Sequence, residues 1–142
     1  MGDEAMAGYC LLVDDSSVIR KVARRILSDS IAEFAEVSTG HEALDSCASR
    51  MPDIILLDFD LPDMTALEVI PDLRALPDGQ HPRIIVCLYE LDVTRIMRAK
   101  RSGADGYILK PFDRAYLTEQ FTLLMSAEPQ KRPRPTVGET PR

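Results

Sequence analysis

The stretch LLVDDSSVIRKVARRIL, residues 11–27, carries the two patterns from which the fold can be predicted. It begins inside an apolar run and passes at once into an acidic pair, Asp14 and Asp15. After the pair, apolar residues recur at spacings of three and four, as they do on one face of an α-helix. A buried strand followed by an amphipathic helix is therefore predicted here.

The same alternation of apolar runs and helical spacing continues through residues 1–126. The runs that suit strands are residues 9–13, 34–37, 54–57, 84–88 and 107–109. Three of these runs are apolar at nearly every position, which is typical of strands buried on both faces of a parallel sheet. Five repeats of strand and helix predict an α/β fold, a doubly wound five-stranded parallel sheet with helices on both faces.

The composition is that of a folded globular protein. Of the 142 residues, 45% are hydrophobic and 28% are charged, which excludes largely disordered and fibrous chains. No apolar run approaches the roughly 20 residues of a membrane-spanning helix, and the first residues lack the pattern of a signal peptide. We therefore expect a cytoplasmic protein without membrane insertion.

Charge divides the chain into a body and a tail. Residues 1–126 hold 13 Lys and Arg against 21 Asp and Glu, a net charge of -8, which argues against nucleic-acid binding. Residues 127–142 hold four basic residues against two acidic ones, together with four prolines. Such a segment buries too little apolar surface to offset the entropy lost on ordering. We expect one domain over residues 1–126 and a flexible, Pro-rich basic tail over residues 127–142.

Charged side chains follow three of the predicted strands at their carboxyl ends. Asp14 and Asp15 follow the first strand, Asp58 the third and Lys110 the fifth. In a sheet of this kind the functional site lies at that edge. Each residue also has a purely structural interpretation. The acidic pair can cap the helix that starts near Ser16, Asp58 can close a turn, and Lys110 can be a solvated lysine.

Taken together, these side chains indicate a site for a cation and a phosphoryl group. Carboxylates that converge at one edge repel one another unless a cation lies among them, and Mg²⁺ takes oxygen ligands. A carboxylate can also attack phosphorus to form an aspartyl phosphate, while a metal and a lysine offset the charge of the transferred group. We therefore assign Asp14 and Asp15 to Mg²⁺ binding together with Asp58, Asp58 also to nucleophilic attack, and Lys110 to phosphoryl recognition.

Three stretches resemble the receiver domains of response regulators, in particular the CheY-like single-domain proteins. They are LLVDDSSVIRKVARRIL (residues 11–27), PDIILLDFDLPDMTALEV (residues 52–69) and SGADGYILKPFD (residues 102–113), and the resemblance extends over about residues 8–126. It implies that the body is a receiver domain with a flavodoxin-like sheet in the order 2-1-3-4-5. It also implies a cis peptide bond between Lys110 and Pro111.

The resemblance also assigns roles to single residues. Asp14 and Asp15 match the acidic pair of the family, and Asp58 matches its phosphoacceptor. Lys110 matches the family's lysine, and Tyr107 matches its aromatic switch residue. The phosphorylation site implied by the resemblance is therefore complete.

Two positions depart from the family pattern. Ala66 stands where the turn after the phosphoacceptor usually has glycine, a modest change if the backbone there avoids positive φ. Leu88 stands where the fourth strand usually ends in a Ser or Thr whose hydroxyl contacts the phosphoryl group. A register shifted by one residue would place Cys87, a weak donor, at that position instead. We expect the usual coupling between this hydroxyl and Tyr107 to be broken or replaced.

The segment that follows Leu88 is unusually basic for an acidic domain. Four cations fall within seven positions, namely Arg95, Arg98, Lys100 and Arg101. At about 100° per residue, the three arginines lie along one helix face, whereas Lys100 falls on the apolar face between Val93 and Ile96. One interpretation is a solvated basic face, with the Lys100 stem passing the edge of the core. The other is a site for an anionic, guanine-containing ligand, with Tyr89 as a stacking surface.

This arginine-rich segment resembles that of a branch of CheY-like proteins called Cle, described as binding cyclic di-GMP around the fourth helix and then engaging the flagellar motor. On that resemblance we expect a signalling module rather than an enzyme. It would be a cyclic di-GMP-responsive effector of the flagellar motor switch or another motility protein. The alternative is a conventional response regulator or phosphate sink that a histidine kinase switches through Asp58. A third hypothesis, a magnesium-dependent phosphohydrolase, lacks a second general base.

Overall fold

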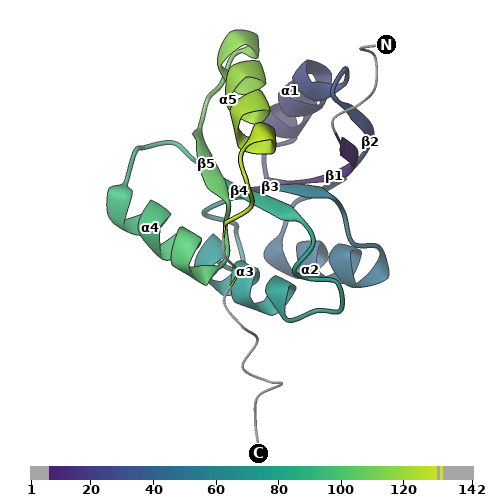
Figure 1. The fold of residues 1–142 in the computed structure, drawn as a ribbon, viewed down its shortest axis with the longest axis vertical. Helices are drawn as coiled ribbons and strands as arrows, with labels where there is room; N and C mark the ends of the chain where they lie inside the picture. Colours follow the sequence, from purple (N-terminus) through teal and green to yellow (C-terminus); the bar gives the residue numbers. More distant parts are fainter. Residues whose placement is uncertain (1–6, 131, 133–142) are drawn as a thin grey trace, which may run out of the picture.

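The structure is a computed structural model that describes residues 7–130 and 132. Over this part of the chain, five strands alternate with five helices (Figure 1). The strands are β1 (Ala7–Val13), β2 (Ile31–Val37), β3 (Ile54–Asp58), β4 (Arg83–Leu88) and β5 (Gly106–Leu109). The helices are α1 (Ser17–Leu27), α2 (Gly40–Ser49), α3 (Ala66–Arg74), α4 (Val93–Ser102) and α5 (Arg114–Ser126). None of these helices is both long enough and apolar enough to span a membrane.

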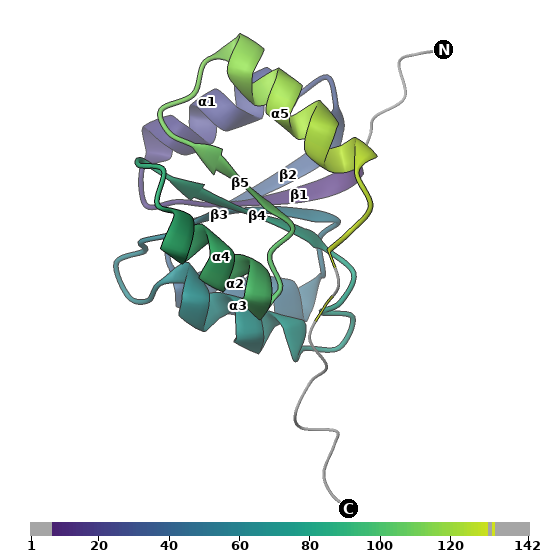
Figure 2. The same cartoon turned by 60° about the vertical axis from the view of Figure 1, so that its left-hand side comes forward.

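The strands form one parallel sheet in the order β2-β1-β3-β4-β5. Helices α1 and α5 cover one face of the sheet, and α2, α3 and α4 cover the other (Figure 2). The flavodoxin-like fold predicted from the sequence is thus confirmed. A helix joins each strand to the next, so all five strands end at the same edge of the sheet.

Two apolar layers hold the helices to the sheet. The central strand β3 is buried at all five of its positions. Its side chains alternate, with Ile55 and Leu57 in the layer under α2, α3 and α4, and Ile54 and Leu56 in the layer under α1 and α5. Burial on both faces is the reason why this apolar run is unbroken in the sequence.

The edge strand β2 is longer than predicted. The sequence predicts a strand over residues 34–37, whereas β2 already pairs with β1 at Ile31, opposite Ala7. Glu33 is exposed at this edge of the sheet and interrupts the apolar pattern. A strand that is only partly covered cannot be recognised in full from an apolar run.

The buried stripe of α4 also differs from the predicted one. The sequence predicts an apolar face that includes Val93, but its side chain is 65% exposed, and Met97 is 45% exposed. The buried residues of the helix are Ile96 and Ala99, because α4 meets the sheet and α3 along a narrow stripe. Lys100 is half-buried beside that stripe. The prediction that Lys100 lies between two core residues is therefore wrong for one of them, because Ile96 belongs to the core and Val93 does not.

A buried arginine ties the amino ends of β4 and β5 together. The side chain of Arg74, at the end of α3, donates to the carbonyl oxygens of Gly79, Pro82 and Gly103 over 2.6–3.1 Å. It also pairs with Asp105 at 3.3 Å. Burial lowers the pKa of Arg74 to about 10, so the guanidinium stays charged at neutral pH. No sequence pattern predicted this network.

The first residues of the tail lie against this network. Gln130 donates its backbone N–H to Asp105 Oδ1 at 2.9 Å, and Arg132 forms an ion pair with the same carboxylate. Residues 131 and 133–142, which make up most of the tail expected to be flexible, lie outside the described part of the chain.

Replacing Arg74 with methionine should lower the free energy of unfolding by about 3 kcal/mol, because three buried carbonyl groups and Asp105 lose their charged donor. Urea denaturation followed by circular dichroism measures the change. The matched control is Arg101→Met, an exposed arginine on α4, which should change the free energy of unfolding by less than about 0.5 kcal/mol. Equal losses in the two variants would mean that the Arg74 network does not stabilise the fold.

Candidate functional site

The carboxyl ends of three strands bring four charged side chains together. Asp14 and Asp15 follow β1, Asp58 is the last residue of β3, and Lys110 follows β5. The three aspartates offer carboxylate oxygens that all lie within 4.8 Å of one another. The four residues singled out in the sequence therefore form one cluster, which we call the acidic site.

The Lys110 ammonium lies between two buried carboxylates. Its Nζ donates to Asp14 Oδ2 at 2.9 Å and to Asp58 Oδ1 at 3.0 Å. The Lys110 side chain is only 2% exposed, so it is not the solvated lysine of the structural interpretation. A buried charge needs such partners to offset its lost hydration. The peptide bond between Lys110 and Pro111 is cis, as the family resemblance implies.

Burial and charge oppose each other at this site. Loss of hydration raises the pKa of the Asp58 carboxyl above its ordinary value, although the bond from Lys110 works in the other direction. Burial lowers the pKa of Lys110, but its bonds to Asp14 and Asp58 outweigh this effect and leave the pKa raised. The lysine is therefore charged at neutral pH, and the negative charge of Asp58 opposes folding.

The acidic site fits a hard divalent cation. Three carboxylates face one ammonium group, which leaves an excess of negative charge. The donors are all carboxylate oxygens, the ligands that Mg²⁺ prefers, and Asp15 is exposed, which leaves room for bound water. The residues able to hold Mg²⁺ are Asp14, Asp15 and Asp58.

Local hydrogen bonds orient two of these aspartates. Ser16 donates its backbone N–H to Asp14 Oδ1 at 2.9 Å, and its hydroxyl accepts from the backbone N–H of Ile19 at 3.2 Å. Ser16, rather than either aspartate, therefore caps α1. Asp60 donates its backbone N–H to Asp58 Oδ1 at 3.3 Å.

The turn after Asp58 accommodates alanine. Ala66 is the first residue of α3, is fully buried, and donates its backbone N–H to the carbonyl oxygen of Phe59 at 2.8 Å. Among the residues that the structure describes, Asp78 is the one non-glycine residue with a positive φ. Ala66 therefore has a backbone conformation that any residue can adopt.

Leu88 and Tyr107 share one apolar layer. Leu88 is 3% exposed in the layer under α3 and α4, and Tyr107 is half-buried against the same layer. Cys87 belongs to the opposite face and pairs with Asp58 in the strand register. Burial raises the pKa of its thiol to about 12. The β4 side chain on the face of α4 is therefore that of Leu88, which has no hydroxyl.

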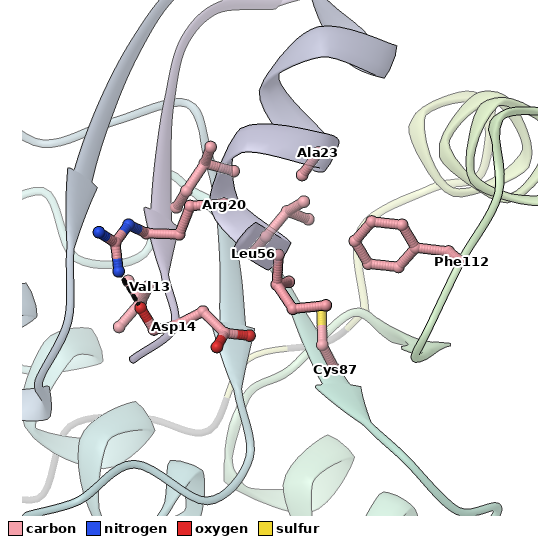
Figure 3. Close-up of a pocket in the computed structure, with 9 residues that line it drawn as sticks. Val13, Asp14, Arg20, Ala23, Leu56, Cys87 and Phe112 are labelled. Carbon is pink, nitrogen blue, oxygen red and sulfur yellow. Dashed lines mark hydrogen bonds between the residues drawn. The ribbon is translucent and has the colours of Figure 1, made fainter. Parts of the chain in front are cut away.

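A small cavity lies between α1 and the sheet, next to Asp14 (Figure 3). Its volume is about 20 Å³, room for a single water molecule. The lining is mostly apolar and includes Leu56 and Phe112, and Arg20 Nη1 donates to the Asp14 carbonyl oxygen at 2.5 Å. This cavity is too small for a nucleotide.

The residues assigned to ligand binding divide into two groups. Tyr89 and Arg95 lie toward the acidic site. Lys110 Nζ is 4.5 Å from the centre of the Tyr89 ring, and Arg95 pairs with Asp60. The second group is Arg98, Lys100 and Arg101. Within residues 7–130 and 132, no carboxylate lies within 4.0 Å of the side-chain nitrogens of this second group. Arg95 therefore differs from the other two arginines in having a carboxylate partner in the described part of the chain.

Large apolar side chains are exposed beside these cations. They are Tyr89 (62%), Leu91 (60%), Val93 (65%) and Met97 (45%), in the β4–α4 loop and the first turns of α4. We call them the apolar patch. The sequence did not indicate this patch, because helical spacing alone placed Val93 on the apolar face of the helix.

Comparison with known proteins agrees with this fold and cluster. The chain matches the model of the response regulator receiver domain over residues 10–122. It is 30% identical to the chemotaxis protein CheY of Halobacterium salinarum, over 86% of this chain and 100% of that protein. It is also 30% identical to CheY of Pseudomonas aeruginosa, over 78% of this chain and 90% of that protein. Among solved structures, CheY4 of Vibrio cholerae superposes with a TM-score of 0.77 at 27% identity, over 83% of this chain and 98% of that one.

Asp58→Asn should stabilise the fold when no divalent cation is present. Because the pKa of Asp58 is raised, the folded protein binds a proton there more tightly than the unfolded chain, in which the pKa is near 3.8. The gain should be absent below about pH 3, grow as the pH rises from 3.8 to the raised folded pKa, and stay constant above it. We expect about 1 kcal/mol at neutral pH, or about 3 °C in melting temperature.

Thermal unfolding at several pH values measures this effect, with Asp72→Asn, an exposed carboxyl on α3, as the control that should show no such trend. A loss of stability in Asp58→Asn at every pH would show that the bond to Lys110 outweighs the cost of burial.

Proposed function

Because the chain belongs to the response regulator receiver domain family, we propose that it is a signalling module triggered mainly by cyclic di-GMP, with the flagellar motor switch or another motility protein as its partner. One observation carries the proposal. Arg98, Lys100 and Arg101 form a cationic group on α4 without carboxylate partners among the described residues, in a domain that is otherwise acidic. The chemotaxis names of two relatives support a role in motility, and we place the protein in the cytoplasm.

The chemistry of the cationic group suits a cyclic dinucleotide. Arg98 and Arg101 are exposed and three residues apart on α4, so they lie on one side of the helix. Arginine forks pair bidentately with guanine O6 and N7 and also bind phosphate. Cyclic di-GMP offers two guanines and two phosphates, and the exposed ring of Tyr89 offers a stacking surface.

The apolar patch is the proposed contact for the partner protein. Val93 and Met97 are exposed one turn apart on α4, and Leu91 is exposed in the loop before it. Exposed apolar surface marks protein interaction sites when it is contiguous. A ligand on α4 would therefore lie next to the partner surface. This arrangement allows the ligand to alter partner binding directly.

The acidic site supports phosphorylation as a second input, with a histidine kinase as the donor. Asp58 would attack phosphorus through a carboxylate oxygen while the bond from phosphorus to the donor breaks, and Lys110 would offset charge on the transferred group. Bound Mg²⁺ supplies further positive charge at the phosphoryl oxygens. This is the basis of the alternative function, a conventional response regulator or phosphate sink. In either function the domain works as a signalling module and needs no enzymatic turnover.

We propose phosphorylation as the second input, and not the main one, because Leu88 has no hydroxyl group. Mg²⁺ with beryllofluoride should load Asp58 and shift the amide resonances of residues 14, 58 and 110. The ring resonances of Tyr107 should hardly change, because Leu88 cannot donate a hydrogen bond to the phosphoryl mimic. NMR of the full chain measures both responses. Leu88→Thr should enlarge the Tyr107 response, and Asp58→Asn should abolish the shifts that beryllofluoride adds to those of Mg²⁺ alone. A large Tyr107 response in the unaltered chain would favour the conventional switch.

Calorimetric titration with cyclic di-GMP tests the proposed trigger. The chain should bind cyclic di-GMP more tightly than cyclic di-AMP, since each arginine–guanine pair contributes about 1–3 kcal/mol of discrimination. Arg98→Ala should raise the Kd by about tenfold. The control Arg25→Ala, an exposed arginine on α1, should leave it unchanged. Equal affinity for both dinucleotides, or no binding of either, would leave a solvated basic face and favour the phosphorylation-driven alternative.

A further inference from the structure

We propose that Asp60 competes with the α4 ligand for Arg95. In the free protein the Asp60 carboxylate holds Arg95, and an anionic nucleotide has to replace that carboxylate. The inference rests on the proposed function and extends it. It connects the ligand site on α4 to the loop that follows Asp58.

The first support is the environment of Arg95, in the first turn of α4. Its Nη2 donates to Asp60 Oδ1 at 2.5 Å, and its guanidinium carbon lies 4.0 Å from the centre of the Phe59 ring. Phe59 is buried, so it offers a fixed surface beside the guanidinium. Arg95 is thus held by a carboxylate and by a ring, whereas Arg98 and Arg101 have no such carboxylate among the described residues.

The second support is the strength of this ion pair. The Arg95 side chain is 35% exposed and that of Asp60 is 62% exposed. An ion pair at the surface contributes little stability, because water screens both charges. A ligand phosphate or guanine edge can therefore replace the Asp60 carboxylate at Arg95 at small cost, and the Phe59 ring would still orient the guanidinium.

The third support is the position of Asp60 beside the acidic site. Its backbone N–H donates to Asp58 Oδ1 at 3.3 Å, and it forms an isolated antiparallel bridge with Thr65. These contacts hold Asp60 in place when its bond to Arg95 breaks. A ligand that takes the place of Asp60 at Arg95 therefore leaves an unneutralised carboxylate next to the cluster of Asp14, Asp15 and Asp58.

Tyr89 provides a second connection between the ligand site on α4 and the acidic site. Its ring lies over the ammonium of Lys110, which bonds both Asp14 and Asp58. A ligand that stacks on Tyr89 and pairs with Arg95 would break the contact of Tyr89 with Lys110 and that of Arg95 with Asp60. By linkage, occupancy of either site then changes the affinity of the other.

The test is calorimetric titration of the full chain with cyclic di-GMP, using Asp60→Asn and Glu90→Gln. Both variants remove one negative charge near α4. In the described residues, however, only Asp60 pairs with Arg95, while Glu90 is an exposed neighbour of Tyr89. Asp60→Asn should bind cyclic di-GMP about two- to fivefold more tightly than the unaltered chain, as expected for the loss of one competing surface ion pair. Glu90→Gln should show no comparable gain.

A double-mutant cycle isolates the pair. In an Arg95→Ala background, Asp60→Asn should no longer increase the affinity, because the competitor acts only through Arg95. Melting temperatures check that all variants are folded. The Asp60 side chain is exposed, so its replacement should leave the fold intact.

The outcomes separate this inference from the proposed function. Binding by the unaltered chain with no gain in Asp60→Asn, or an equal gain in Glu90→Gln, would overturn the competition and leave the cyclic di-GMP trigger standing. Absence of binding in every variant, including Asp60→Asn with its freed Arg95, would overturn both.

Discussion

The Lys110 ammonium between the carboxylates of Asp14 and Asp58 is the interaction on which the rest of the structure depends. It joins the ends of β1, β3 and β5, although β4 lies between β3 and β5 in the sheet. The Lys110 side chain must therefore extend past the end of β4. The backbone N–H of Lys110 donates to the carbonyl oxygen of Leu88 at that end. The chain that leaves β4 consequently starts at the acidic site, which is why Tyr89 lies over the lysine.

Much of the fold and of the acidic site could be predicted because both follow from local sequence. A strand buried on both faces, such as β3, leaves an unbroken apolar run, and a parallel sheet collects the residues that follow such runs at one edge. The edge strand β2 was predicted too short because exposure of Glu33 breaks its run. The Arg74 bonds to Gly103 could not be predicted, because they connect residues 29 positions apart through carbonyl groups, which every residue type carries.

The surface of α4 shows a different limit of sequence analysis. Helical periodicity identifies an apolar arc, but it does not say which part of that arc meets the sheet. On α4 the small side chain of Ala99 allows close contact, so the core takes a narrow stripe that includes Ile96 and leaves Val93 and Met97 in solvent. The same geometry places apolar and cationic side chains next to each other on one exposed surface. That adjacency, which no single periodic pattern predicts, is the basis on which we propose both a nucleotide and a protein partner for α4.

Leu88 places an apolar side chain, without a hydroxyl, at the end of β4 between the acidic site and α4. A hydroxyl at this position could follow the charge on Asp58, whereas the leucine side chain is fixed in the same apolar layer as Tyr107 and has no polar contact to exchange. The contacts that do connect the two regions are the Tyr89 ring on Lys110 and the Asp60 carboxylate on Arg95. Both involve a cation, and in each contact the partner of that cation, Tyr89 or Asp60, is exposed. Because neither contact involves Leu88, our proposal that α4 is the main input does not require a hydroxyl at the end of β4.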